Sequence, residues 1–572
     1  MPCFLYLAFV ALLATASLAA AQNQVTYNVV ALTKAGESVA VVVDGKNYPL
    51  QPSPDTAILH TGSAPAPQQN YHYALCSGQT CTTRETPDRS PSIQNGATPN
   101  EFFNRTWTTK SLKTLSTLLE PVPEVQRVGS DLHPADQIPT VHIVADQSQV
   151  DNMQANYDKQ VEVPATMTYI RADGIQHFAN VTFELSGHGS RKYPKQNYNI
   201  KLNKKDKLAG YKNLKLRAVG SPDPSYIRED LVYKAMQAIG VPTSHSSFVR
   251  FFVNDQAIGL FGFVEAIKPN WVDNNFGNGS KDYKPGYLYY GAEHSTPQSR
   301  KKNHTADLAY YGDNVAEYQD GQYTIKAGPD KTNFEPLMRF TKFVNDAPTN
   351  DQGIDTWKQH LDVESFLRSM AIEFVYGLAD GYSAYAHNYA LYEYQQDKFV
   401  YFGYDHTNSL GYVAMKTLEN TLESDYHKYP YLAQQPLTAK VLQVPALQKR
   451  FEELIGAFNQ LLLSADVLDP VLDSYLAFLE EDVAWDKTLP RLGPKNPKLS
   501  VSNDPKIGDV YDDAWAVAHD DIPLHTALKG TIDRLSLMSV SQWAQKKYQG
   551  VSKKYPYDKS AVTPAARITS DM

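Results

Sequence analysis

The patterns along the 572-residue sequence predict an α+β fold with more than one domain. Short segments in which apolar and polar residues alternate, typical of strands, recur between residues 25 and 264. From residue 335 onward, apolar residues recur instead with the period of an amphipathic helix. Two strand-like runs, 389–394 and 399–404, interrupt these helices and predict a hairpin.

Residues 22–110 form the first predicted domain, a small β-sandwich-like unit. Its strand segments, 25–30, 39–43 and 71–75, are separated by turns that contain Gly, Pro and Asp. Cys76 and Cys81 flank a turn that contains glycine, so we expect a disulfide between them. Residues 111–138 are punctuated by proline and are predicted to be a linker.

The next domain spans residues 139–470 and begins with strands. Its first strand patterns are 141–145, 164–171, 181–185 and 198–202. A helix is predicted for 226–239, because Asp223-Pro224-Ser225 precedes it and Gly240 follows it. A further hairpin is expected from 248–253 and 258–264. Residues 268–330 are polar and rich in Gly and Tyr, so we expect an insertion with loops.

Helices are expected in the remainder of the chain. Their predicted positions are 361–378, 441–463, 467–484 and 527–548. Residues 485–530 are expected to be irregular, 471–548 to form a C-terminal helical extension and 549–572 a polar tail. A β-rich lobe with one helix, followed by a helical lobe with a hairpin at the junction, is the order of an atypical two-lobe protein-kinase-like domain. In such a domain the nucleotide lies between the lobes.

Residues 1–21 are similar to an export signal, because an apolar run over residues 4–18 is followed by three alanines. The run is almost long enough to cross a bilayer, so an uncleaved anchor is the alternative. No other stretch is apolar enough for a transmembrane segment, and the C-terminus has no apolar tail of a GPI signal. We therefore expect a protein of the secretory pathway, with N-glycosylation sequons at Asn104, Asn180, Asn278 and Asn303.

The charge of the chain argues against some partners. The net charge is −8, which gives no electrostatic reason to expect binding to nucleic acid or to an anionic membrane surface.

Three polar residues around the predicted hairpin form the candidate site. Asp380 precedes the hairpin, Asn388 lies at its entrance and Asp405 at its exit, so all three can meet at one end of it. A base, a carboxamide and a carboxylate are the groups that Mg²⁺ and a phosphoryl donor require. The alternative is that these are turn-forming acids and a capping asparagine.

Several runs resemble the spore-coat CotH kinase family, which has fungal members that include cell-surface invasins of Mucorales. The run at 185–202 (LSGHGSRKYPKQNYNIKL) is similar to the family's Arg-Gly-x-Ser-Ser-Arg and Pro-Lys-Lys-x-Tyr-x-Ile pattern. Residues 223–231 (DPSYIREDL) and 248–265 also resemble it, and Asp380, His387-Asn388 and Tyr404-Asp405 complete the set. The resemblance covers about residues 139–470 in consistent order.

The resemblance implies roles for individual residues. Asp380 matches the catalytic aspartate that takes the proton of a Ser or Thr hydroxyl, and Asn388 and Asp405 match the ligands of Mg²⁺ or Mn²⁺ on ATP. The turn between Gly187 and Gly189 would bring backbone N–H groups to the phosphates. The further nucleotide-binding candidates are Lys201, its expected ion-pair partner Glu229, Arg191 and Arg228.

The expected function is an atypical secretory-pathway kinase that phosphorylates Ser or Thr of coat, wall or secreted proteins. One alternative is a secreted or cell-surface invasin or adhesin that binds a host-cell receptor and uses the kinase-like fold as a scaffold. Another is a pseudokinase that holds nucleotide without turnover. Since fold alone does not decide among these, the geometry of the site must do so.

Overall fold

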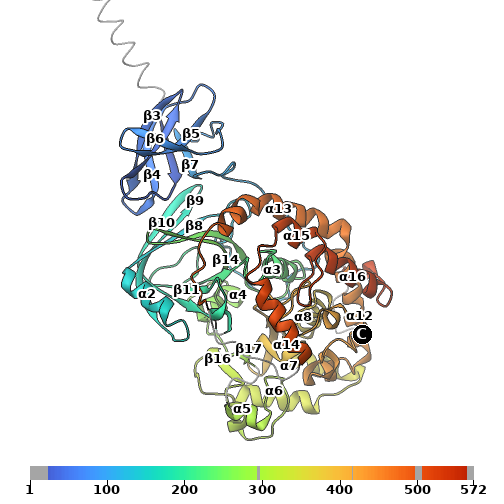
Figure 1. The fold of residues 1–572 in the computed structure, drawn as a ribbon. Coiled ribbons are helices and arrows are strands. Elements are labelled where there is room, and N and C mark those ends of the chain that lie inside the picture. Colours follow the sequence, from blue (N-terminus) through green and yellow to red (C-terminus); the bar gives the residue numbers. More distant parts are fainter. Residues whose placement is uncertain (1–23, 188, 293–296, 415, 496–504, 563–572) are drawn as a thin grey trace, which may run out of the picture.

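The computed structural model describes residues 24–187, 189–292, 297–414, 416–495 and 505–562. The expected export signal lies outside the described residues. Figure 1 shows an N-terminal sheet, then a barrel, then a helical part that is wrapped around a smaller sheet. This mixture of strands and helices confirms the predicted α+β class.

The N-terminal domain is one seven-stranded sheet in the order β6-β5-β2-β3-β4-β1-β7. The sheet folds over an apolar core to which Val29 of β1, Val41 of β2 and Tyr73 of β5 all contribute, so its two halves face one another. A disulfide joins Cys76 of β5 to Cys81 of β6. The strands are β1 (Gln24–Val30), β2 (Glu37–Val43), β3 (Lys46–Ser53), β4 (Thr56–Pro65), β5 (Tyr71–Ser77), β6 (Thr80–Arg84) and β7 (Ala97–Phe102).

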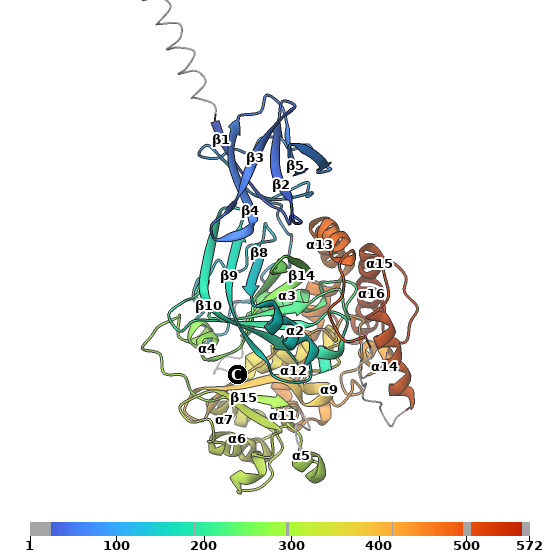
Figure 2. The same cartoon turned by 60° about the vertical axis from the view of Figure 1, so that its left-hand side comes forward.

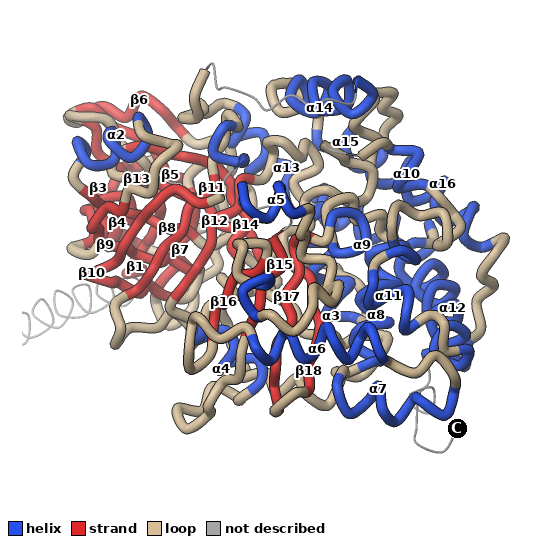
Figure 3. Tube along the Cα trace, turned by 90° about the horizontal axis from the view of Figure 1, so that it is seen from below, coloured by secondary structure: helices blue, strands red, loops and turns tan. Residues whose placement is uncertain are grey.

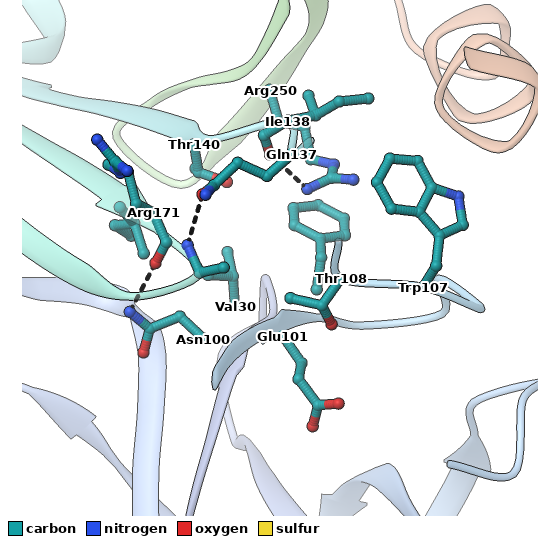
Figure 4. Close-up of a pocket in the computed structure, with 13 residues that line it drawn as sticks. Val30, Asn100, Glu101, Trp107, Thr108, Gln137, Ile138, Thr140, Arg171 and Arg250 are labelled. Carbon is teal, nitrogen blue, oxygen red and sulfur yellow. Dashed lines mark hydrogen bonds between the residues drawn. The ribbon is translucent and has the colours of Figure 1, made fainter. Parts of the chain in front are cut away.

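The N-terminal sheet rests on one end of the barrel, as Figure 2 shows. Phe102 packs against Phe252 and Trp485, with ring centroids 6.2 and 5.8 Å away. Asn100 donates a hydrogen bond of 2.8 Å from Nδ2 to the carbonyl of Arg171, and Figure 4 shows this contact in the seam between the two parts. Apolar and polar contacts together therefore hold the first domain against the barrel.

The barrel is closed, with the order β10-β11-β12-β14-β13-β8-β9. Aromatic rings such as Phe183, Tyr198, Phe251 and Phe261 fill its interior, and because side chains alternate along a strand, polar residues face outward. The helix α3 (Arg228–Ala238) follows β12. The strands are β8 (Thr140–Ala145), β9 (Glu162–Arg171), β10 (Gly174–Ser186), β11 (Asn197–Leu202), β12 (Asn213–Ala218), β13 (Ser246–Val253) and β14 (Gln256–Glu265); a short helix, α2 (Gln147–Ala155), links β8 to β9.

The predicted hairpin after the central helix is confirmed as β17 (His387–Gln395) and β18 (Lys398–Gly403). It belongs to a four-stranded sheet in the order β16-β15-β17-β18. The strands β15 (Leu288–Ala292) and β16 (Tyr323–Ala327) come from the segment that we expected to be an insertion with loops. The two strands were not predicted: β15 pairs with β17 and β16 with β15, which buries Tyr289 and Tyr323.

The helices gather on one side of the molecule and most strands on the other, as Figure 3 shows. The expected irregular stretch 485–530 contains two helices, and the closing helix begins at Val540 rather than at residue 527. The helices are α4 (Pro269–Phe276), α5 (Pro297–Lys302), α6 (Glu335–Asp346), α7 (Ile354–His360), α8 (Val363–Val375), α9 (Tyr382–Tyr385), α10 (Leu418–Leu422), α11 (Pro436–Val441), α12 (Pro445–Phe458), α13 (Ala465–Lys487), α14 (Pro505–Val517), α15 (Leu524–Lys529) and α16 (Val540–Ser552).

The helical part has a continuous apolar core, in which the helix α8 is buried along its whole length. The described part of the expected polar tail packs on this core, since Arg450 donates a hydrogen bond of 2.7 Å to the carbonyl of Ala561. Within the described ranges, no helix combines the length and the apolar character that crossing a membrane requires.

Candidate functional site

The end of the β17–β18 hairpin brings the predicted site residues into one neighbourhood. Tyr389 pairs with Gly403, and Tyr404 N donates a hydrogen bond of 2.9 Å to the carbonyl of Asn388, the residue before Tyr389. Asp405 directly follows Tyr404. Asp380 lies in the turn between α8 and α9, and its carboxylate reaches Asn388.

Amide groups fix the Asp380 carboxylate. Asn388 Nδ2 donates at 3.0 Å both to Asp380 Oδ2 and to the Asp380 carbonyl. Asn408 Nδ2 lies 3.5 Å from the same Oδ2, and the carbonyl of Asn408 accepts a hydrogen bond of 2.9 Å from the backbone of Ala379. The carboxylate is therefore held in one orientation, as a general base requires.

A buried carboxylate supports the turn that follows Asp380. Glu373 accepts hydrogen bonds from the Ser383 backbone at 2.9 Å, from Ser383 Oγ at 2.6 Å and from the Tyr401 hydroxyl at 2.7 Å. Burial raises the pKa of Glu373 even though these donors oppose the shift. A Cβ on Gly381 would lie 2.8 Å from Glu373 Oε2, so glycine allows this close approach.

Two basic residues of β12 face Asp405. Arg217 donates from Nη1 to Asp405 Oδ2 at 3.2 Å and from Nη2 to Oδ1, and Lys215 Nζ lies 3.8 Å from Oδ2. Burial alone would raise the pKa of Asp405, but Arg217 and then Lys215 hold this pKa well below its usual range. Asp405 therefore carries its negative charge at neutral pH, and 34% of its side chain is exposed.

The same arginine links β12 to α3. Arg217 Nε donates to Glu229 Oε2 at 2.6 Å, and the Tyr233 hydroxyl donates to Glu229 Oε1 at 3.2 Å. Asp405, Arg217 and Glu229 thus form a chain of charges from the hairpin, across the barrel strand, to the helix.

Sequence reasoning missed β12 and with it Lys215 and Arg217. The signal was present, because Asn213, Lys215 and Arg217 alternate with two leucines in the period of a strand. In the structure Leu214 and Leu216 point into the barrel core, while the basic side chains lie on the outer face.

The expected ion pair between Lys201 and Glu229 is wrong. Lys201 is exposed on β11 and pairs with Asn213, four residues before Arg217. At about 3.3 Å per strand residue, this places Lys201 roughly 13 Å along the sheet from the arginine that binds Glu229.

Arg191 and Arg228 are occupied by structural contacts. Arg191 donates to the carbonyls of Lys159 and Leu185, both at 2.7 Å, and so holds the loop that follows β10. Arg228 is fully buried and donates to the carbonyls of Leu410 and Met538 and to Asp223. The terminal nitrogens of Arg191 and the guanidinium of Arg228 therefore bind protein groups, whereas Nε of Arg191 is buried without a partner among the described residues.

The glycine turn lies between β10 and β11. Gly187 has a φ of +87°, a conformation that favours glycine, and Gly189 begins a short 3-10 turn that ends at Lys192. The ring of Tyr193, which follows this turn, stacks on Trp515 of α14 with centroids 5.5 Å apart. The C-terminal extension therefore contacts the segment that leads out of the glycine turn.

The donor set of the site fits a hard divalent cation. Asp405 supplies carboxylate oxygens and Asn388 a carboxamide oxygen, which are ligand types that Mg²⁺ prefers. Arg217 contacts both oxygens of Asp405, so a cation would share this carboxylate with the guanidinium. Asn408 adds a buried Oδ1 that has no hydrogen-bond partner among the described residues. An orphaned buried oxygen on a residue that also contacts the Asp380 carboxylate is the kind of group that a cation would satisfy.

The four sequon asparagines, Asn104, Asn180, Asn278 and Asn303, are all exposed.

A separate cluster of His304, Glu317 and Asp320 has the spacing of metal ligands. However, Lys302 Nζ lies 2.7 Å from Glu317 and 2.8 Å from Asp320, so an ammonium group already supplies the positive charge there.

Comparison with known proteins relates the chain to one family. A model of the family described as CotH kinase protein matches residues 183–488. Invasin CotH3 of Rhizopus delemar is 27% identical over 481 residues, which are 82% of this chain and 76% of that protein. Invasin CotH2 of the same organism is 27% identical over 75% of this chain and 71% of its own. Spore coat protein homolog 1, also of this organism, is 25% identical over 83% and 74%.

Proposed function

Because this chain belongs to the CotH kinase protein family, we propose that it transfers the γ-phosphoryl group of ATP to a Ser or Thr hydroxyl of a protein. The barrel with α3 would be one lobe and the helical part the other, with the nucleotide between them. The observation that carries the proposal is the position of Asp405, which joins the hairpin that bears Asn388 to Lys215 and Arg217 of the barrel.

In the proposed reaction Asp380 is the catalytic base. Its carboxylate, oriented by Asn388 and Asn408, would accept the proton of the acceptor hydroxyl. The hydroxyl oxygen would bond to the γ-phosphorus as the bond between that phosphorus and the β–γ bridging oxygen breaks, and ADP would leave. The phosphate ester formed is the product.

Asp405 and Asn388, with Asn408 beside them, would hold Mg²⁺ or Mn²⁺ in this site. The ion would neutralise the negative charge that develops on the transferred group. Lys215 would contact the phosphates, taking the role we had expected of Lys201, and Arg217 would hold Asp405 in place. Burial lowers the pKa of Lys215, with Arg217 as a second cause, so its ammonium is costly to keep charged without an anion nearby.

Transfer of labelled phosphate from ATP to the protein itself or to an acidic model protein tests the proposal. Wild type is expected to incorporate label with Mg²⁺ or Mn²⁺, Asp380→Asn to lose at least 100-fold of the rate, and Asp405→Ala to lose metal-dependent nucleotide binding as well. Asp397→Asn is the matched control, since Asp397 lies in the turn at the opposite end of the same hairpin. Equal labelling of wild type and Asp380→Asn would contradict the proposal.

A second function is suggested by two relatives that are named invasins, CotH3 and CotH2 of Rhizopus delemar. Under this proposal the chain, secreted or held at the cell surface, would bind a host-cell receptor. Two results together would favour this function over phosphoryl transfer. The first is binding to host cells that persists in Asp405→Ala, and the second is the lack of a nucleotide-induced thermal shift with either metal.

A further inference from the structure

A hollow of about 540 Å³ lies away from the hairpin end that carries Asp380. Its walls come from the linker after the N-terminal sheet, the end of α4 and the end of β17. Three aromatic residues line it, Phe276, Tyr283 and Tyr394, together with the acids Glu124 and Asp282. The volume falls within the range of roughly 300–1,000 Å³ that is typical of small-ligand sites.

The aromatic walls are held in place by their own hydrogen bonds. The hydroxyls of Tyr283 and Tyr392 lie 2.7 Å apart, and the Tyr394 hydroxyl donates to Glu124 Oε1 at 3.0 Å. Rigid aromatic faces beside carboxylates suit a sugar ring, whose C–H groups pack on an aromatic face and whose hydroxyls donate to carboxylate oxygens.

One sequon lies at this hollow. Gly277 and Ser280 line it, and Asn278 stands between them as the acceptor residue of Asn278-Gly279-Ser280. Asn278 is exposed, and among the described residues none hydrogen-bonds its side-chain amide. Asn104 differs, since its Oδ1 accepts a hydrogen bond of 2.9 Å from the Thr86 backbone.

The turn that presents Asn278 is fixed by its backbone. Asn278 N donates to the carbonyl of Gln126 at 2.9 Å, and Gly279 N donates to that of Asp273 at the same distance. Gln126 itself lines the hollow. A glycan attached to this turn would therefore start from a defined position beside the aromatic walls.

We propose that Asn278 carries an N-linked glycan whose first N-acetylglucosamine lies in this hollow, against Tyr283 and Tyr394. In the transfer step Asn278 Nδ2 bonds to C1 of the sugar and releases one proton. The bond between C1 and the diphosphate of a lipid-linked oligosaccharide donor breaks, and the lipid diphosphate leaves. The inference rests on passage through the secretory pathway and is independent of phosphoryl transfer.

Secretion of the full chain from a eukaryotic host tests the proposal in two measurements. Mass spectrometry of the peptide that contains Asn278 is expected to show a glycan, and an unmodified peptide would overturn the proposal. Trimming with an endoglycosidase that leaves a single N-acetylglucosamine should leave Tm unchanged. Asn278→Gln and Ser280→Ala, which both prevent attachment, should each lower Tm by about 2 °C or more.

A second pair of variants separates sugar packing from a general effect of glycosylation. Tyr283→Ala should abolish the Tm difference between the glycosylated protein and its Ser280→Ala counterpart, whereas Tyr283→Phe, which keeps the ring, should preserve it. Asn180→Gln is the control, because Asn180 is exposed on the barrel strand β10. A Tm difference that is the same with alanine, phenylalanine or tyrosine at position 283 would overturn the placement of the sugar.

Discussion

Arg217 on β12 donates from Nε to Glu229 of α3 at 2.6 Å while its two terminal nitrogens bind Asp405 beyond the hairpin. One guanidinium thus joins a barrel strand, the helix that follows it and the loop that leaves the four-stranded sheet. Its planar fork suits two carboxylates at once, which an ammonium cannot match. The geometry makes Arg217 the residue on which the alignment of the proposed site depends.

Replacing Arg217 tests this dependence. Arg217→Ala leaves Glu229 largely buried and Asp405 about one-third exposed without their main partner, so we expect the free energy of unfolding to fall by about 3 kcal/mol, the lower end of the range for buried pairs. Arg217→Lys should fold but lose bidentate binding, and with it at least tenfold in the affinity for ATP with Mg²⁺. Chemical denaturation and calorimetric titration measure the two effects.

Lys201→Ala is the matched control for these variants, because Lys201 is exposed on the neighbouring strand. It should leave both stability and nucleotide affinity within error of wild type. If Lys201→Ala loses ATP affinity while Arg217→Lys keeps it, Lys201 contacts the nucleotide as we first predicted from the sequence.

The contrast between Lys201 and Arg217 shows which parts of the site could be predicted from the sequence and which could not. The hairpin and its acids could be predicted, since the strand pattern and the positions of Asp380, Asn388 and Asp405 are local features. The ion pair of Arg217 with Asp405 joins residues 188 positions apart, and no local pattern records it. β12 offers only two leucines as an apolar signal, and the strand β15 is recognisable only once β17 is there to pair with it.

Glu373 provides a test of how the turn after Asp380 is held. In Glu373→Gln, one carboxylate oxygen that now accepts a hydrogen bond becomes an NH₂ group. The buried donor that faced this oxygen then has no acceptor. We expect a loss of roughly 1–3 kcal/mol in the free energy of unfolding and a fall in transfer rate with little change in ATP affinity. Denaturation and initial-rate measurements at saturating ATP would show both.

Glu364→Gln is the comparison for Glu373→Gln, because Glu364 lies on the same helix α8 but pairs with Arg368 and Arg450, away from the turn. It should lower stability without a specific loss of rate. An equal loss of rate in both variants would mean that Glu373 acts on the fold alone.

Asp362 gives a prediction about pH. Its side chain caps α8 by accepting from Ser365 N at 2.9 Å, and burial, followed by the neighbouring Glu124 carboxyl, raises the pKa of Asp362 well above its ordinary value. At a pH between the ordinary pKa of Asp362, which applies to the unfolded chain, and its raised pKa in the folded protein, the unfolded chain has released a proton that the folded chain keeps. This group therefore makes stability fall as pH rises through that window.

Asp362→Asn should remove the part of the fall in stability with rising pH that Asp362 causes. Asparagine caps a helix as well as aspartate does and carries no titrating proton. We expect the variant to gain stability relative to wild type at pH 8 but not at pH 4, as followed by Tm in the same buffers. Asp355→Asn, on the exposed face of α7, should change neither slope nor Tm. A steeper fall of Tm with pH in Asp362→Asn would contradict the assignment.

The stacking of Tyr193 on Trp515 predicts that the C-terminal extension steadies the glycine turn. Beyond this stack, Gly493 N donates to the carbonyl of Pro194 at 2.9 Å, so the extension holds two successive residues after the turn. Trp515→Ala should therefore raise the KM for ATP several-fold with a smaller change in kcat, because the turn would sample more conformations before nucleotide binds. His519→Ala is the matched control: its exposed ring lies 4.7 Å from Trp515 but leaves the Tyr193 stack intact. If Trp515→Ala and His519→Ala alter KM equally, contact between α14 and the segment after the turn has no part in binding ATP.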